Sequence, residues 1–309
     1  MRFFSRRSGG TAQEWEAPQR PLTAAIITMA RDEGPMLQAW VRHHAGLVGA
    51  AHLVVLDDSS TDGSAEAVAA QGVTVHHLPS LTGKPFERTR MRILSGIATG
   101  LLHAYDYVVA LDADELLVVD PAFGTLDAFL RARDCPETVG VVGLNVVHTP
   151  GEAPLDLSRP ITEQRAHAIF APGMCKPSLK RVPARWGLAS HGIAAPYVPD
   201  PGVLMLHLKF ADRDRLLAIS AARHQAFLDE GRAKASTWSK PADDIVAVLD
   251  QAVAGLGERE VAEFDPGSID LAGLIVDDNG VRRPVRQGQL EALLLQEPTR
   301  IPTRFKGLA

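Results

Sequence analysis

The chain has 309 residues, enough to bury a full hydrophobic core in one or two domains without disulfide bonds. Its 37 acidic and 32 basic residues give a net charge of −5, which argues against a general binder of nucleic acid. With only two cysteines, Cys135 and Cys175, the sequence excludes a four-thiolate zinc site and a disulfide framework. We therefore expect a protein of a reducing compartment, the cytoplasm, without a nucleic-acid partner.

The N-terminal segment 1–21 is predicted to be a mobile basic arm. Its arginines are not followed by the apolar stretch that a signal peptide requires. Its first seven residues include arginines and phenylalanines, a combination that also permits weak peripheral contact with anionic lipid. The longest apolar run, Val139 to Val147, is far shorter than the roughly 20 residues that span a bilayer, so no transmembrane segment is expected.

From residue 22, short apolar runs alternate with segments of helical periodicity, which is typical of an α/β domain with a largely parallel sheet. We expect strands at 24–29, 52–56, 73–78 and 107–111, with helices at 35–47, 64–70 and 86–103 between them. Asp57 and Asp58 follow the second strand, where they are candidates to bind a nucleobase or a ribose and candidates to form a turn, two roles that can coexist. Ligands bind at such carboxyl ends of parallel strands.

The pattern is less regular beyond residue 121. We expect strands at 139–147 and 203–209, separated by a loop rich in proline and glycine and by a basic segment. The last hundred residues are expected to be mostly amphipathic helix, for example at 213–228 and 243–256. The predicted organisation is therefore one α/β domain at 22–210 and a mainly helical extension at 211–309.

Asp112 and Asp114 follow the fourth predicted strand. Side chains two residues apart on an extended segment point the same way, so both carboxylates are expected on one side. Two close carboxylates raise each other's pKa unless a cation lies between them, and oxygen ligands favour Mg²⁺ or Mn²⁺. The pair therefore predicts a divalent metal site, although acidic residues also terminate strands at protein surfaces.

Four motifs occur in a recognisable order: Met29-Ala-Arg31-Asp-Glu33, Trp40-x-x-His43-His44, Leu56-Asp57-Asp58-Ser-Ser60-Thr61-Asp62-Gly63 and Leu111-Asp112-Ala-Asp114-Glu115. They resemble family 2 glycosyltransferases of the GT-A fold, in particular the subgroup with a Lys/Arg-Asn/Asp-Glu opening and an Asp-x-Asp-Glu motif. The resemblance covers residues 22–120 well, is partial from 121 to 210 and is weak after 210. It implies a Rossmann-like α/β fold with a mixed, mainly parallel sheet flanked by helices.

The resemblance also implies roles for matched residues. Asp57 would contact the nucleobase, with Arg31 and Glu33 beside it. Asp112 and Asp114 would engage the ribose and a Mn²⁺ or Mg²⁺ ion that bridges the diphosphate of a nucleotide sugar. A metal at this place stabilises the negative charge that develops as the nucleoside diphosphate leaves.

Downstream residues fit the same site less specifically. His207 and Lys209 share one face of a predicted strand, so the imidazole is a candidate third metal ligand and the ammonium a candidate phosphate contact. His191 is a comparable candidate. Lys176 belongs to a basic segment that we expect either to bind the diphosphate or to form a solvated face.

A catalytic base is harder to place. An inverting transferase needs a carboxylate near the acceptor hydroxyl, and Glu163 is the first candidate, with Asp156 and Glu152 behind it. Glu115 is expected to support the metal site from behind. Glu163, Asp156 and Glu152 lie outside the matched motifs, so an inverting or a retaining reaction remains open.

The resulting hypothesis is a metal-dependent glycosyltransferase of the hexosyltransferase type, using a UDP-sugar. The acceptor is a glycan, a lipid-linked molecule or a protein, and the oligomeric state is open. Two alternatives remain: a non-catalytic scaffold that binds a sugar nucleotide or a glycan and, less favoured, a sugar nucleotidyltransferase. The latter normally has a glycine-rich basic loop after its first strand, which Arg31 to Gly34 does not form.

Overall fold

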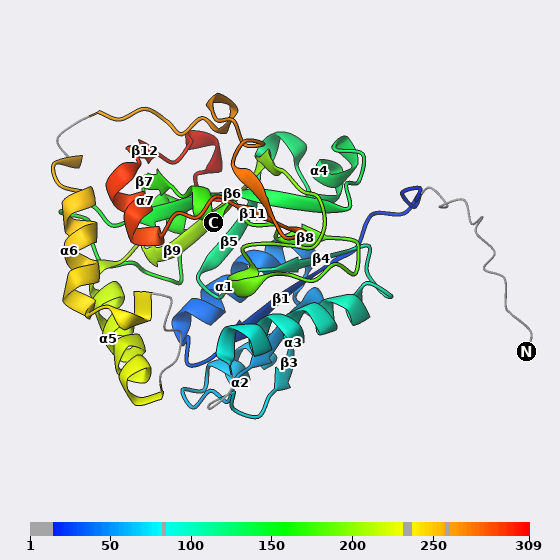
Figure 1. The fold of residues 1–309 in the computed structure, drawn as a ribbon, viewed down its shortest axis with the longest axis horizontal. Helices are drawn as coiled ribbons and strands as arrows, with labels where there is room; N and C mark the ends of the chain where they lie inside the picture. Colours follow the sequence, from blue (N-terminus) through cyan, green and yellow to red (C-terminus); the bar gives the residue numbers. More distant parts are fainter. Residues whose placement is uncertain (1–14, 82–84, 231–236, 257–259) are drawn as a thin grey trace, which may run out of the picture.

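The structure, a computed structural model, describes residues 15–81, 85–230, 237–256 and 260–309 (Figure 1). Most of the predicted arm at 1–21 lies outside the described residues. Its described part, residues 15–21, contacts the domain, since Arg20 forms an ion pair with Asp106 at 2.7 Å. No helix within these ranges is long and apolar enough to cross a membrane.

Four parallel strands form the N-terminal half of the main sheet, in the order β3-β2-β1-β4. They are β1 (Ala24–Ala30), β2 (Leu53–Asp57), β3 (Thr74–His77) and β4 (Tyr107–Ala110), and α1 (Pro35–Val48), α2 (Ser64–Ala69) and α3 (Phe86–Leu101) connect them. The predicted alternation of strands and helices is confirmed, with ends that differ by one or two residues.

Helices cover both faces of this parallel half. Ile26 of β1 belongs to the same core cluster as Trp40 of α1, whereas the next residue, Ile27, belongs to a second cluster with Leu94 of α3. Successive strand residues point to opposite faces, so α1 and α3 lie on opposite sides of β1. This arrangement explains why every residue of β1 is buried.

The sheet becomes mixed beyond β4. The next elements are β5 (Glu115–Val119), α4 (Leu126–Ala132), β6 (Thr138–Val147), β7 (His167–Phe170), β8 (Leu179–Lys180) and β9 (Pro199–Phe210). β8 is antiparallel to β4 and β6, whereas β9 runs parallel to β6 and antiparallel to β5. The expected mixed α/β sheet with flanking helices is confirmed. In the β5–β9 register, Glu115 lies opposite His207.

The C-terminal part contains more strand than its sequence indicated. Among the described residues beyond 210, the α-helices α5 (Arg213–Glu230), α6 (Ala242–Ala252) and α7 (Gln289–Leu295) occur with β10 (Ile275–Asp278), β11 (Val281–Pro284) and β12 (Pro298–Arg300). Asn279 and Gly280, both with positive φ, form the tight turn of the β10–β11 hairpin, an Asn-Gly signal that the helical periodicity obscured. β12 joins the main sheet beside β7, so sheet pairing continues beyond the predicted boundary at residue 210.

Gly143, in the middle of β6, lies where the segment that contains Met174 packs closely against the strand. A methyl group on its Cα would lie 2.5 Å from Cβ of Met174 and 2.7 Å from the carbonyl oxygen of Met174. The segment that contains Met174 belongs to the same region as the candidate site, because Gly173 lines the cleft described below. The glycine therefore permits this segment to approach β6.

We expect Gly143→Ala to lower the free energy of unfolding by about 1–3 kcal/mol, the usual cost of overpacking. Urea denaturation measures the effect. Gly96→Ala is the control, because Gly96 lies in α3 with open space around its Cα, where alanine stabilises a helix by about 0.5–1 kcal/mol. Equal stability of wild type and Gly143→Ala would contradict the packing described here.

Candidate functional site

A cleft of about 2000 Å³ lies at the carboxyl ends of β1, β4 and β9. Its walls also include the start of α3, the loop 187–192, the cleft-facing side of α5 and the segment from β11 to α7. The two weaker base candidates, Asp156 and Glu152, do not line it. Of the other twelve predicted site residues, eight line it: Arg31, Glu33, Asp58, Asp112, Asp114, His191, His207 and Lys209. The other four, Asp57, Glu115, Lys176 and Glu163, are not among its lining residues.

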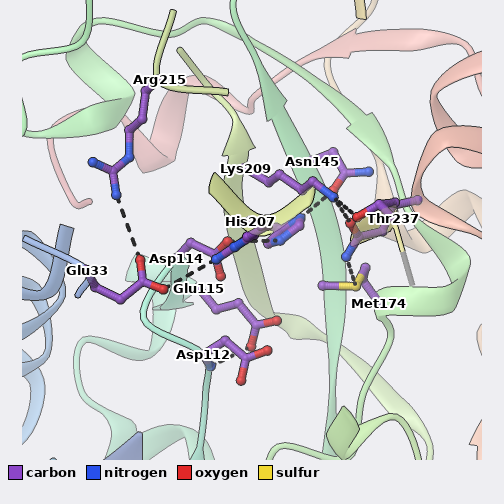
Figure 2. A network of polar contacts seen from close by, with 12 residues as sticks. Glu33, Asp112, Asp114, Glu115, Asn145, Met174, His207, Lys209, Arg215 and Thr237 are labelled. Atoms are coloured by element: carbon purple, nitrogen blue, oxygen red, sulfur yellow. Dashed lines mark hydrogen bonds and ion pairs between the residues drawn. The ribbon is translucent and has the colours of Figure 1, made fainter. Parts of the chain in front are cut away.

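Asp114 and His207 lie side by side in this cleft. Oδ2 of Asp114 is 3.6 Å from Nε2 of His207, and Figure 2 shows the two side chains pointing toward each other. Burial raises the pKa of Asp114, but His207, Arg223 and Lys209 outweigh burial and hold that pKa below its usual value. Asp114 is therefore a carboxylate at neutral pH.

Asn145 of β6 orients the imidazole from its other side. Nδ1 of His207 donates a hydrogen bond of 2.7 Å to Oδ1 of Asn145, which leaves Nε2 directed at Asp114. Asn145 is fully buried, and within the described residues its Nδ2 has no hydrogen-bond partner. Leaving this buried amide group unpaired costs free energy. Asn145 nevertheless keeps the orientation in which its Oδ1 accepts the hydrogen bond from His207.

The donor set of Asp114 and His207 suits Mn²⁺ or Mg²⁺ in part. A carboxylate oxygen and an imidazole nitrogen are adjacent, and a partner on Nδ1 is the usual way to orient a metal-ligating histidine. In the part of the chain that the structure describes, no three acidic, histidine or cysteine side chains lie together as a metal-binding group. Two protein ligands completed by water and phosphate oxygens is a common arrangement for Mg²⁺.

Asp112 does not join Asp114 as a second metal ligand in this arrangement. Its Oδ1 accepts a hydrogen bond from Arg90 of α3, and its Oδ2 lies 3.9 Å from Nζ of Lys176. Burial raises the pKa of Asp112, but Arg90 and Lys176 lower it further than burial raises it. The structure thus brings together two of the three predicted metal ligands and directs the third, Asp112, toward cations.

Lys176 and Glu115 form a buried ion pair beneath the cleft. Nζ of Lys176 lies 2.5 Å from Oε1 of Glu115, and each side chain is 1% exposed. Burial raises the pKa of Glu115 despite the nearby ammonium. Neither Glu115 nor Lys176 is among the residues that line the cleft, so the predicted diphosphate contact of Lys176 is not one that its side chain makes from this position.

Lys209 lines the cleft and is held by two side chains. Nζ donates hydrogen bonds to Oγ1 of Thr237 at 2.7 Å and to Oε1 of Gln289 at 3.0 Å. Burial, reinforced by Arg223, lowers the pKa of Lys209 to about 7. Lys209 thus holds its amino group at the cleft in a fixed position, where a bound anion would favour its protonated form.

Two arginines of α5 are functional candidates that the sequence analysis missed. Arg223 and Arg215 lie 3.3 Å and 3.8 Å from the carboxylate of Glu33, and Arg223 also lines the cleft (Figure 2 shows Arg215 and Glu33). Burial raises the pKa of Glu33, and Arg223 opposes this rise. Their spacing of eight residues, about 2.2 helical turns, places both side chains toward one side of the helix and was the available signal.

The predicted nucleoside contacts divide into two groups. Arg31 and Asp58 line the cleft, and Oδ1 of Asp58 accepts a hydrogen bond from the backbone N–H of Leu81. Asp57 is buried and accepts hydrogen bonds from the Ser60 backbone at 3.0 Å and from His77 at 2.9 Å. The Ser60 contact is that of a turn, one of the roles considered for Asp57, and the His77 contact joins the end of β2 to β3.

His191 lies in the loop 187–192 at the side of the cleft. Nδ1 donates a hydrogen bond of 2.6 Å to the carbonyl oxygen of Gly173, so Nε2 is the unprotonated nitrogen of the neutral ring. Burial, with a contribution from Lys176, lowers the pKa of His191 to about 4. The ring is therefore neutral at physiological pH.

Glu163 lies away from these residues. It ends a short 3₁₀ helix, Ile161–Glu163, where it is exposed and pairs with Arg159 at 3.6 Å. Nearby backbone groups belong to the C-terminal end of the chain, since Thr162 donates from its N–H to the carbonyl oxygen of Ala309. The structure does not bring Glu163 to the cleft.

No protein-family model and no curated protein matches the sequence. Similar solved structures include GalNAc-T7 with UDP, GalNAc and Mn²⁺, at 13% identity over 78% of this chain and 57% of that chain, with a TM-score of 0.39. The mannosyltransferase PcManGT from Pyrobaculum calidifontis, in complex with GDP-Man and Mn²⁺, is 16% identical over 85% of this chain and 82% of that chain, with a TM-score of 0.37.

A CMP:2-keto-3-deoxy-manno-octonic acid synthetase complexed with CTP is 15% identical over 52% of this chain and 65% of that chain, with a TM-score of 0.28. The chain thus spans less than two thirds of the synthetase and of GalNAc-T7. TM-scores this low carry no argument about activity, which must be inferred from the site itself.

We expect Asn145→Leu to weaken Mn²⁺ binding about 10- to 100-fold, because the lost acceptor no longer orients His207. Titration of the metal followed by electron paramagnetic resonance measures the change. Asn145→Asp keeps an acceptor and is expected to retain binding. Thr28→Val is the control, since Thr28 is a buried residue of β1 that does not line the cleft. Wild-type affinity in Asn145→Leu would refute the orienting role.

Proposed function

We propose that this protein is a metal-dependent glycosyltransferase that takes a sugar from a nucleotide-sugar donor. The main support is the pairing of Asp114 with His207 at the strand ends, with Lys209 and Arg223 close enough to lower the pKa of Asp114. This combination offers a metal two ligands and offers phosphate oxygens two cations. The motif order in the sequence favours family 2 of the GT-A glycosyltransferases.

The volume of the cleft agrees with a two-substrate reaction. Pockets for one small molecule measure roughly 300–1,000 Å³, whereas this cleft measures about 2000 Å³. A nucleotide sugar and an acceptor can therefore occupy it together. The nucleoside would lie near Arg31 and Asp58, and the proposed donor is a UDP-sugar with a glycan, lipid-linked or protein acceptor.

The protein side chains would share the binding of the donor. Asp114 and His207 would hold Mn²⁺ or Mg²⁺, which when bound neutralises charge on the leaving nucleoside diphosphate. Lys209, held by Thr237 and Gln289, would donate to a phosphate oxygen from a fixed position. Arg223 would add a second positive charge, although its contact with Glu33 also orders the cleft wall.

We expect UDP with Mn²⁺ to stabilise the wild type by about 2.7 kcal/mol at a ligand concentration of about 100 Kd, on the order of 5 °C in Tm. Asp114→Asn removes the ligand charge and is expected to abolish the shift. Differential scanning fluorimetry measures both proteins. Glu163→Gln, outside the cleft, is the matched control and is expected to keep the wild-type shift.

If no nucleoside diphosphate gives a metal-dependent shift in Tm, the proposal is refuted. Slow donor hydrolysis by the wild type separates the alternatives, because a competent transferase releases sugar from some nucleotide sugar. A binding scaffold gives the thermal shift without hydrolysis. A nucleotidyltransferase instead releases pyrophosphate from a nucleoside triphosphate and a sugar phosphate.

A further inference from the structure

We propose that Lys176 is a positioning residue that holds the Asp112–Glu115 turn against the loop 187–192 from beneath the cleft. It does so without touching the substrate. The expected effect on UDP binding rests on the proposed function, whereas the expected effect on hydrogen exchange rests only on the contacts of the described residues. It assigns Lys176 a role different from the phosphate contact that its basic sequence surroundings suggested.

The ammonium of Lys176 connects three groups on two segments. Nζ lies 2.5 Å from Oε1 of Glu115, 3.9 Å from Oδ2 of Asp112 and 3.1 Å from Oγ of Ser190. Two of these groups belong to the acidic turn after β4, and the third belongs to the loop 187–192. A lysine that is 1% exposed and has no free direction toward the cleft acts on the substrate only through these partners.

The backbone of Lys176 supplies a fixed point for these contacts. Its carbonyl oxygen accepts a hydrogen bond of 2.9 Å from the N–H of Val141 in β6, a strand whose ten residues are all buried. Lys176 therefore connects the acidic turn, through its side chain, to β6, through its backbone. Glu115 extends this support, since its Oε2 accepts a hydrogen bond of 3.0 Å from the N–H of Asp112.

The loop on the other side of Lys176 has an unusual backbone. Ala189 and Ser190 have φ values of 51° and 56°, a left-handed conformation that costs free energy for residues other than glycine. His191, the next residue, lines the cleft. The hydrogen bond from Lys176 to Ser190 thus helps to retain the conformation that presents His191.

Three variants separate positioning from simple structural support. Lys176→Met removes the ammonium and leaves Glu115 as an unpaired buried carboxylate, so it lowers Tm. The double variant Lys176→Met/Glu115→Gln removes both charges, and the introduced glutamine side chain still has an oxygen that can accept from the N–H of Asp112. Lys180→Met is the matched control, because Lys180 is also buried but its ammonium contacts the Trp186 ring and the Ala184 carbonyl.

We expect the double variant to recover most of the Tm lost in Lys176→Met. Its dissociation constant for UDP with Mn²⁺, measured by calorimetry, is nevertheless expected to stay at least 10-fold above wild type, because Asp112 and Ser190 still lack their ammonium. Lys180→Met is expected to lower Tm and to bind UDP as wild type does. Joint recovery of Tm and affinity in the double variant would overturn the proposal.

A second measurement needs neither nucleotide nor metal. Hydrogen exchange of the Asp112 and Glu115 amides is expected to be faster in the double variant than in the wild type and in Lys180→Met. Unchanged exchange overturns the proposal. If the wild type fails to bind UDP while exchange changes as expected, the proposed function fails and the positioning role stands.

If the double variant does not fold, Ser190→Ala provides the same test with one hydroxyl removed. It is expected to weaken UDP binding about threefold at an unchanged Tm, and to speed exchange in the loop 187–192. Wild-type affinity together with wild-type exchange would overturn the link between Lys176 and this loop.

Discussion

Three carboxylates, those of Asp112, Asp114 and Glu115, lie within four residues of one turn, and their mutual repulsion is the constraint on which the site depends. Each carboxylate has a different nearest partner: an arginine of α3 for Asp112, a histidine of β9 for Asp114 and a buried lysine before β8 for Glu115, and this lysine also lies 3.9 Å from Asp112. The turn is therefore a junction of elements distant in the sequence. The cleft acquires its shape because these elements must converge to balance the charge.

This balance also distinguishes the three carboxylates chemically. Glu115 is enclosed with its lysine, and Asp112 is held between two cations, whereas Asp114 shares the cleft with an imidazole whose other nitrogen is already engaged. Only the last arrangement leaves an oxygen and a nitrogen directed at the same space. Within this short segment, the carboxylate of Glu115 is buried, that of Asp112 lies between two cations at the cleft wall, and that of Asp114 is open to a ligand in the cleft.

Sequence reasoning succeeded where local pattern and strand ends determine the outcome. The buried apolar runs predicted β1, β2 and β4, and acidic residues after them predicted the edge where Asp58, Asp112 and Asp114 line the cleft. It could not determine which cation meets which carboxylate, since Lys176 and Asp112 lie far apart in the sequence. It also missed Arg223, because helical periodicity does not reveal what an amphipathic face covers. The hairpin of β10 and β11 had a local signal in Asn279-Gly280, whereas the three-residue β12 depends on pairing with the distant β7, which no local pattern encodes.

The return of the chain to the sheet at β12 has a consequence for the last hundred residues. β12 hydrogen-bonds to β7, which lies next to β6. A chain shortened at residue 210 would leave the edge of β7 with unsatisfied backbone groups, and such an edge invites pairing with another molecule. The C-terminal region thus supplies the hydrogen-bond partners of β7, a contribution to the sheet that is separate from lining the cleft.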